Sequence, residues 1–133
     1  MSDASALPRP LRSVAAELAA YHDCEIIVRS NGTPCNLPDR TRSHLFRIGQ
    51  EAMYNAVRHG SPKNVLVSLT WGEGNFSLTI SDDGTGFDPK KVSGPPQGHF
   101  GLSSMRDRAL RVGGTFDIES NPQGTRLSVT VPI

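Results

Sequence analysis

Alternation of apolar and polar residues in the second half of the chain is the feature that most limits how this sequence can fold. Every second residue is apolar in four runs, which cover residues 65–71, 76–80, 115–120 and 125–131. Two short links rich in turn formers, 72-GEGN-75 and 121-NPQG-124, join these runs into pairs. A period of two buries one side of a strand and leaves the other in water. We therefore expect two antiparallel hairpins in a sheet that is buried on one face.

Three other segments have the periodicity of helices. Apolar residues recur at intervals of three and four over residues 11–21, 39–59 and 102–110. Asp39, which opens the second segment, is a candidate helix cap, and Gly113-Gly114 ends the third. Residues 25–30 (EIIVRS) are expected to form one more short strand.

The predicted order is helix, strand, helix, strand, strand, loop, helix, strand, strand. Helices on one face of a mixed, mostly antiparallel sheet satisfy this order, so we predict a two-layer α/β sandwich with three helices on one face. A chain of 133 residues is long enough for one domain and too short for two. We assign residues 1–8 to a loose N-terminal tail and residues 9–133 to the domain, with a mobile loop over residues 89–100.

Charge and composition exclude several classes of protein. Fourteen basic and thirteen acidic residues give a formal charge of +1, which offers no support for nucleic-acid binding. No apolar run approaches the roughly 18 residues of a membrane span, and the N-terminus lacks the layout of a signal peptide. Cys24 and Cys35 form no CxxC pair, so neither a disulfide framework nor a zinc site is expected. We expect a soluble, cytoplasmic domain.

The stretch 81-SDDGTGFDP-89 combines three acids with two glycines directly after a predicted strand. A calcium loop of the EF-hand type fails in both frames, because neither Asp82 nor Asp83 is followed by the required acids and glycine. The chain contains no GxxxxGK[ST] phosphate loop and no GxGxxG that opens a helix. Taken alone, the stretch is a plain Asp-Gly turn.

The long predicted helix carries a second group of polar residues. Glu51 and Asn55 stand at i and i+4, so both project from one face. A carboxylate beside a carboxamide suits magnesium that arrives with a nucleotide, although a solvated pair is the simpler interpretation. Arg58 and His59 in the last turn either offset phosphate charge or favour the helix dipole.

A third candidate element is 98-GHFGLSSM-105. Gly98 and Gly101 flank the start of a predicted helix, whose free N–H groups form a natural anion site. A lone GxxG is also explained by a loop that needs backbone freedom where it joins a helix.

Together, and in this order, the three elements resemble the ATP-binding (HATPase_c) domain of sensor histidine kinases. That domain belongs to the GHKL superfamily shared with type II topoisomerases, mismatch-repair MutL proteins and a heat-shock chaperone. The resemblance runs from about Leu11 to Ile133 and implies a Bergerat-type ATP-binding fold. The stretches 47-RIGQ-50 and 104-SMRDRAL-110 are most similar to the NarL/DesK-like branch of these kinases.

The family motifs are matched one by one in the sequence. The N-box resembles 51-EAMYNAVRH-59, and the second glycine box resembles Gly98–Gly101. The first glycine box, DxGxG, and the late Gly-Thr pair are matched by Asp82, Gly84, Gly86, Gly124 and Thr125.

The resemblance implies roles for these residues around ATP and Mg²⁺. Asp82 would accept a hydrogen bond from the adenine amine, with Gly84 and Gly86 giving the base room and Thr125 bonding nearby. Asn55 would be the metal ligand, and Glu51 the catalytic residue that orients magnesium or water. The residues implied at the phosphates are Arg58, His59, Gly98, Gly101 and Leu102, with residues 89–100 as the lid. Asp83 has no implied role beyond pointing to solvent or capping the turn.

A histidine kinase also needs a phosphoacceptor histidine. His22-Asp23 is rejected, because position 27 is Ile where the acceptor motif requires Gln, and because Glu51 follows too soon for a helical hairpin. His44 is expected on a helix surface and His99 in the lid.

The resemblance therefore implies a catalytic domain that presents the γ-phosphate of Mg-ATP to a histidine on a separate dimerisation domain. It implies little turnover alone, an indirect link to a response regulator, and no membrane or nucleic-acid contact by this domain. The parent protein could still be membrane-anchored. The alternatives are an anti-sigma-type Ser/Thr kinase of the same fold, which a protein partner would reveal, and a scaffold module that only senses nucleotide.

Overall fold

The computed structural model describes residues 7–59, 61–85 and 101–133. Its elements follow the predicted order, and the predicted loop over residues 89–100 lies outside the described residues. The helices are α1 (Pro8–Tyr21), α2 (Asp39–His59) and α4 (Leu102–Arg111). The strands are β1 (Glu25–Gly32), β2 (Asn64–Trp71), β3 (Asn75–Asp82), β4 (Thr115–Asn121) and β5 (Gly124–Pro132).

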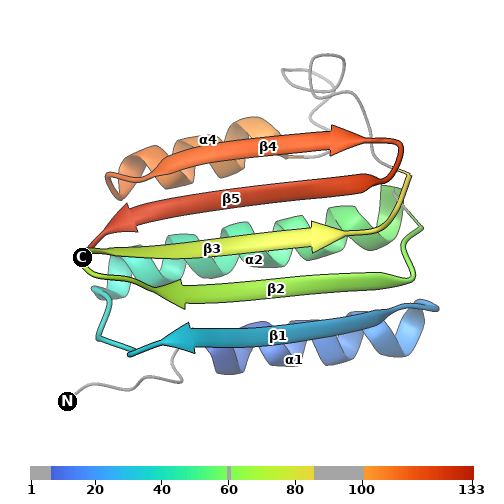
Figure 1. Ribbon diagram of the computed structural model, residues 1–133, viewed down its shortest axis with the longest axis horizontal. Coiled ribbons are helices and arrows are strands. Elements are labelled where there is room, and N and C mark those ends of the chain that lie inside the picture. Colours follow the sequence, from blue (N-terminus) through green and yellow to red (C-terminus); the bar gives the residue numbers. More distant parts are fainter. Residues whose placement is uncertain (1–6, 60, 86–100) are drawn as a thin grey trace.

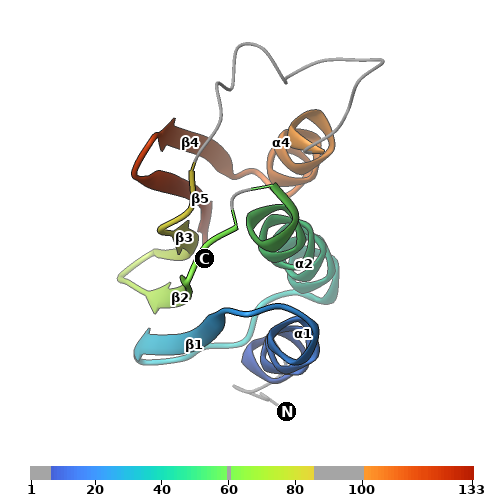
Figure 2. The same ribbon diagram turned by 90° about the vertical axis from the view of Figure 1, so that its right-hand side faces the viewer.

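The five strands form one mixed sheet in the order β1-β2-β3-β5-β4. Strands β1 and β2 are parallel, and the other three pairings are antiparallel (Figure 1). Helices α1, α2 and α4 all lie against the same face of the sheet (Figure 2). The predicted two-layer α/β sandwich is confirmed.

The alternating sequence pattern explains the two faces of the sheet. On β3, Phe76, Leu78 and Ile80 point into the helical layer and are at most 3% exposed. The opposite face carries hydroxyl groups that pair across strands, with Ser77 Oγ 3.1 Å from Thr130 Oγ1 and Thr79 Oγ1 3.3 Å from Ser128 Oγ. Cross-strand hydroxyl pairs of this kind stabilise a sheet face that faces solvent.

Helix α1 begins earlier than the sequence pattern suggested. It starts at Pro8, and Leu7, only 2% exposed, is already part of the core. The predicted tail of residues 1–8 was therefore too long at its end, and residues 1–6 lie outside the described residues. Proline is tolerated at Pro8 because the N–H groups in the first turn of a helix have no partner within the helix.

The helices share a core with the sheet. Leu11 of α1 is fully buried, and a Cβ atom placed at Gly49 of α2 would lie 2.7 Å from Leu11 Cδ2. Gly49 therefore lets α1 approach α2 closely. None of the described helices combines the length and apolar character needed to cross a bilayer.

Asp82 and the end of the chain at Ile133 lie at opposite ends of the sheet. At one end β3 finishes at Asp82, which pairs with Val65 of β2 and Thr125 of β5. At the other end, the backbone N–H of Ile133 donates a 3.0 Å hydrogen bond to the Gly74 carbonyl oxygen. Figure 1 shows that α1 also starts at this second end, so both ends of the described chain lie away from Asp82.

Candidate functional site

Asp82 occupies the end of the central strand β3. Its side chain points to the helical side of the sheet, the same side as Ile80, and is half-buried. The Gly84 N–H donates a 2.8 Å hydrogen bond to Asp82 Oδ1, and the backbone N–H of Thr125 also bonds to this carboxylate. Two strands and the following turn therefore fix the carboxylate in place.

Burial has an electrostatic consequence for Asp82. Desolvation raises its pKa above the ordinary value of 3.8, and the neighbouring Asp83 charge adds to this effect. The N–H groups of Gly84 and Thr125 act in the opposite direction, because they stabilise the ionised form. A carboxylate has room for about four hydrogen bonds, so Asp82 can still accept from a ligand.

The Gly124-Thr125 pair brings β5 against this acid. Gly124 has a φ of +145°, and a Cβ atom there would collide with the carbonyl oxygen of Asp82. Only glycine allows the close approach that places the Thr125 N–H on the Asp82 carboxylate. The Thr125 hydroxyl lies 2.7 Å from Ser120 Oγ and so ties β5 to β4.

Glu51 and Asn55 occupy one side of α2, as their spacing predicted. Asn55 is 9% exposed and is the one buried polar side chain in the described part of the chain, whereas Glu51 is exposed. Gly101, with a φ of +62°, precedes α4, and a Cβ atom there would lie 2.9 Å from Glu51 Oε1. The structure thus brings the predicted N-box against the end of the predicted second glycine box.

The other predicted site residues differ in exposure, and two of them lie outside the described residues. Arg58 and His59 are exposed at the end of α2, and the Arg58 guanidinium lies 5.4 Å from the centre of the Tyr54 ring. Leu102 is only 3% exposed, so its side chain belongs to the core and only its backbone could contact a ligand. Gly86 and Gly98 lie outside the described residues.

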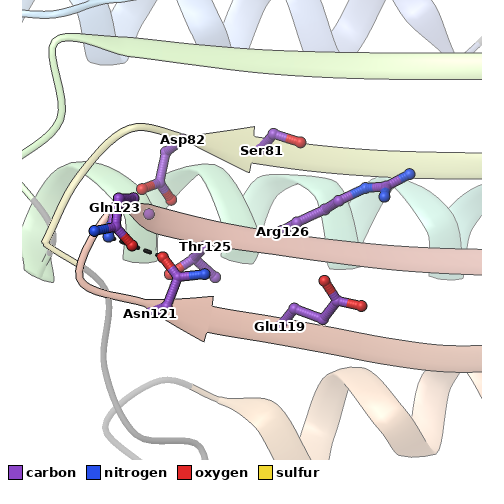
Figure 3. Close-up of a pocket in the computed structure, with 8 residues that line it drawn as sticks. Ser81, Asp82, Glu119, Asn121, Gln123, Thr125 and Arg126 are labelled. Atoms are coloured by element: carbon purple, nitrogen blue, oxygen red, sulfur yellow. Dashed lines mark hydrogen bonds between the residues drawn. The ribbon is translucent and has the colours of Figure 1, made fainter.

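A pocket of about 220 Å³ opens at the end of the sheet beside Asp82. It is lined by Ser81, Asp82, Glu119, Asn121, Gln123, Gly124, Thr125 and Arg126 (Figure 3). Ser81 and Arg126 alternate with Asp82 and Thr125, so they lie on the face away from the helices. The pocket therefore meets Asp82 from the sheet face that points away from the helices, and its lining includes neither Glu51 nor Asn55.

Comparison with known proteins decides the family. The family described as "Histidine kinase-, DNA gyrase B-, and HSP90-like ATPase" matches residues 40–133, which include all of α2 except Asp39, and also Asp82, Gly101 and Thr125. The chain belongs to this ATPase family. Membership confirms the HATPase_c resemblance, and ATP is the nucleotide that the family implies for this site.

The sequence relatives are sensor proteins. The chain is 42% identical over 98 residues to the sensor protein VraS of Staphylococcus epidermidis, and 41% identical over 98 residues to VraS of Staphylococcus aureus. Each match covers 73% of this chain and 27% of the relative, so the chain spans about a quarter of those proteins.

Solved structures of histidine kinases share the fold. The Acinetobacter baumannii histidine kinase AdeS superposes with a TM-score of 0.78 at 16% identity, covering 98% of this chain and 65% of that chain. The mycobacterial sensor histidine kinase MprB gives a TM-score of 0.72 at 24% identity, covering 94% and 93% of the two chains.

The residues present fit the nucleotide that the ATPase family implies. The described residues contain no group of three or more His, Cys, Asp or Glu side chains that could hold a metal alone. A magnesium ion here would instead share its coordination between one protein oxygen and phosphate oxygens, which is the usual arrangement for this ion. The Asn55 carboxamide offers such an oxygen, and the neighbouring Glu51 carboxylate adds negative charge.

Asp83 is the residue that sequence reasoning missed. Its Oδ1 accepts hydrogen bonds from the backbone N–H groups of Lys63 (2.8 Å) and Asn64 (2.9 Å), and its Oδ2 accepts one from Asn64 Nδ2 (3.0 Å). The bonds from Asn64 and Lys63 hold the pKa of Asp83 below its usual value. No sequence motif announces these contacts, because the donors stand 19 and 20 residues earlier in the chain.

Proposed function

We propose that this chain is the ATP-binding catalytic domain of a two-component sensor histidine kinase. It would present the γ-phosphate of Mg-ATP to a phosphoacceptor histidine on a separate dimerisation domain. The observation that carries the proposal is the half-buried Asp82 carboxylate, fixed by two backbone N–H groups and still able to accept a hydrogen bond.

Asp82 would supply the specificity for adenine. Its remaining lone pairs suit the exocyclic amine of adenine, and a buried carboxylate gains most when a donor replaces the lost water. Guanine carries a carbonyl oxygen at the same position, so GTP would set two acceptors against each other. Gly84, which is buried beside Asp82, would leave space for the base because it has no side chain.

The other end of the nucleotide would lie along α2 and the start of α4. Asn55 would ligate magnesium, Glu51 would orient the ion or a water, and the backbone around Gly101 would donate N–H groups to phosphate oxygens. Arg58 and His59 would offset phosphate charge at the end of α2. Bound Mg-ATP supplies the transferable phosphoryl group, and phosphoryl transfer depends mainly on positioning and charge neutralisation.

The histidines whose surroundings are described give no sign of an acceptor. His22 is the residue that ends α1, as expected from the sequence. His44 is partly buried rather than simply on the surface, and its Nδ1 lies 3.2 Å from Arg108 Nη1 of α4. His99 lies outside the described residues. The chain would therefore bind nucleotide but turn it over slowly until another domain supplies the imidazole.

Calorimetric titration of ATP, with and without magnesium, tests the nucleotide site. We expect saturable binding by the wild-type chain, and a loss of about 10- to 100-fold in affinity for Asp82→Asn, because hydrogen bonds to charged groups contribute roughly 1.5–3 kcal/mol. Asn55→Ala should remove the gain that magnesium gives. Glu73→Gln, exposed in the turn at the opposite end of the sheet, is the matched control. Absence of saturable binding by the wild-type chain would contradict the proposal.

A phosphotransfer assay tests the histidine kinase assignment. The chain is mixed with radiolabelled ATP and a purified dimerisation domain from the kinase that contains it. Acid-labile label on the added domain is expected, because phosphohistidine hydrolyses in acid. Acid-stable label on a serine or threonine of an added protein would support the anti-sigma-type alternative instead.

A further inference from the structure

Asp83 links two parts of the molecule that carry different halves of the proposed site. Besides the three hydrogen bonds to its carboxylate, its own backbone N–H donates a 3.2 Å bond to the Asn64 carbonyl oxygen. The turn that follows Asp82 is thereby fixed to the start of β2. In the chain, Lys63 and Asn64 lie four and five residues after the end of α2, the helix that carries Glu51 and Asn55.

The segment that receives Asp83 is the short connection between α2 and β2. Residues 61–63 lie between α2 and β2, and Ser61 has a positive φ of 45°, an uncommon conformation for a residue with a side chain. The Lys63 carbonyl oxygen accepts a 2.9 Å hydrogen bond from the Glu25 N–H of β1. The Lys63 N–H donates its hydrogen bond to the Asp83 carboxylate.

Asp83 is also placed to set the orientation of Asp82. The Gly84 N–H that holds Asp82 Oδ1 follows Asp83 directly, so a change in the backbone at Asp83 would move both ends of that 2.8 Å bond. We infer that Asp83 is a positioning residue for the nucleotide site, which anchors the turn of residues 82–84 to the exit of α2 so that Asp82 meets the base. This inference rests on the proposed function, because it assumes that Asp82 binds adenine.

The alternative is that Asp83 only stabilises the fold. The two roles predict different effects on nucleotide selectivity, because inosine triphosphate has a carbonyl oxygen where ATP has the amine that Asp82 would bind. A misplaced Asp82 loses affinity for ATP but has little to lose with inosine triphosphate. General destabilisation lowers the affinity for both nucleotides by the same factor.

The experiment measures Kd for both nucleotides in the full chain with Asp83→Ala, Asp83→Glu and Asp83→Asn. We expect Asp83→Ala to weaken the binding of ATP about tenfold and the binding of inosine triphosphate less than about twofold. The selectivity ratio, which is the Kd for inosine triphosphate divided by the Kd for ATP, should therefore fall. Asp83→Glu keeps the negative charge but moves the carboxylate away from its donors, so it should also lower this selectivity ratio for ATP over inosine triphosphate. Asp83→Asn keeps an oxygen for both backbone N–H groups and should retain the wild-type ratio within about threefold.

Two outcomes would overturn the inference, and a control variant checks the measurement. Asp117→Ala, which removes an exposed acid from β4, is the control and should leave both Kd values unchanged. If Asp83→Ala does not fold by circular dichroism, Asp83→Glu carries the test. An unchanged ratio in a folded variant, with wild type selective for ATP, overturns the inference alone. A wild type that binds both nucleotides equally well overturns the adenine assignment and this inference together.

Discussion

Two neighbouring acids, Asp82 and Asp83, have opposite surroundings in this structure. Burial raises the pKa of Asp82, whereas hydrogen bonds from residues 63 and 64 lower the pKa of the exposed Asp83. The DxGxG motif allowed Asp82 to be predicted, because the motif fixes its place relative to two glycines. The contacts of Asp83 could not be predicted, because they depend on the register of β2 against β3, which alternation alone does not define.

The affinity for ATP should depend on pH through Asp82. A protonated Asp82 can no longer accept a hydrogen bond with both oxygens, so ATP binding should weaken as the pH falls through the raised pKa of this group. We expect a constant Kd near neutral pH and a rise of up to about tenfold per pH unit below that pKa. Calorimetric titration across the acid range measures it, and inosine triphosphate corrects for protonation of the phosphates. Equal pH dependence for both nucleotides would exclude Asp82 as its source.

The nucleotide-free protein should gain stability when Asp82 is made neutral. Because its folded-state pKa is raised, the ionised form is less favourable in the folded than in the unfolded chain. Asp82→Asn should therefore raise Tm at neutral pH by about 1–3 °C, an effect kept small by the partial exposure of the group. The gain should vanish below the ordinary pKa of 3.8, where both states are protonated. A lower Tm for the variant at neutral pH would contradict this account.

At the scale of single elements, the sequence predicted each described helix and strand but not all of their limits or partners. Periodicity located α2 and the hairpin strands, because buried positions recur every three or four residues along the helix and every second residue along the strands. The start of α1 was placed too late, because the apolar pattern that predicted this helix begins only at Leu11. Neither the parallel pairing of β1 with β2 nor the insertion of β5 between β3 and β4 could be read from local patterns, since both depend on long-range contacts.

The β5 strand should tolerate no side chain at Gly124. Gly124→Ala adds a collision with the Asp82 carbonyl oxygen to the strain of a positive φ, so we expect a loss of about 2–4 kcal/mol in the free energy of unfolding. Gly74→Ala is the matched control, because Gly74 has a φ of +77° but no atom within 4 Å of the added Cβ. Urea denaturation compares the two. Equal losses would show that backbone conformation, not the approach of β5 to Asp82, requires glycine.

Helix α1 should be an integral part of the domain, although the family match begins only at residue 40. Leu11 is fully buried against Gly49, so Leu11→Ala should lower the free energy of unfolding by about 2–5 kcal/mol. Arg12→Ala, at the next and exposed position, should cost less than about 0.5 kcal/mol. Denaturation curves measure both variants. Similar small losses would mean that α1 packs only loosely on the rest of the fold.

At the scale of the whole molecule, the sheet separates the candidate site from the single tryptophan of the chain. Trp71 is 7% exposed and pairs with Phe76 at the end of the sheet opposite Asp82. Its fluorescence should therefore report global unfolding by a red shift, and should change by less than about 10% when ATP binds, because the ring keeps its buried contacts. Fluorescence during an ATP titration and a urea titration measures both. A large change on ATP binding would reveal coupling across the full length of the sheet.

The position of the two ends of the described chain has a practical consequence. In Figure 1, α1 starts and the chain ends on the side of the sheet remote from the end of β3, where Asp82 lies. We therefore expect a reporter protein or surface tether fused after Ile133 to leave the candidate site accessible. The same geometry makes the domain a ready module for constructing a nucleotide sensor by gene fusion.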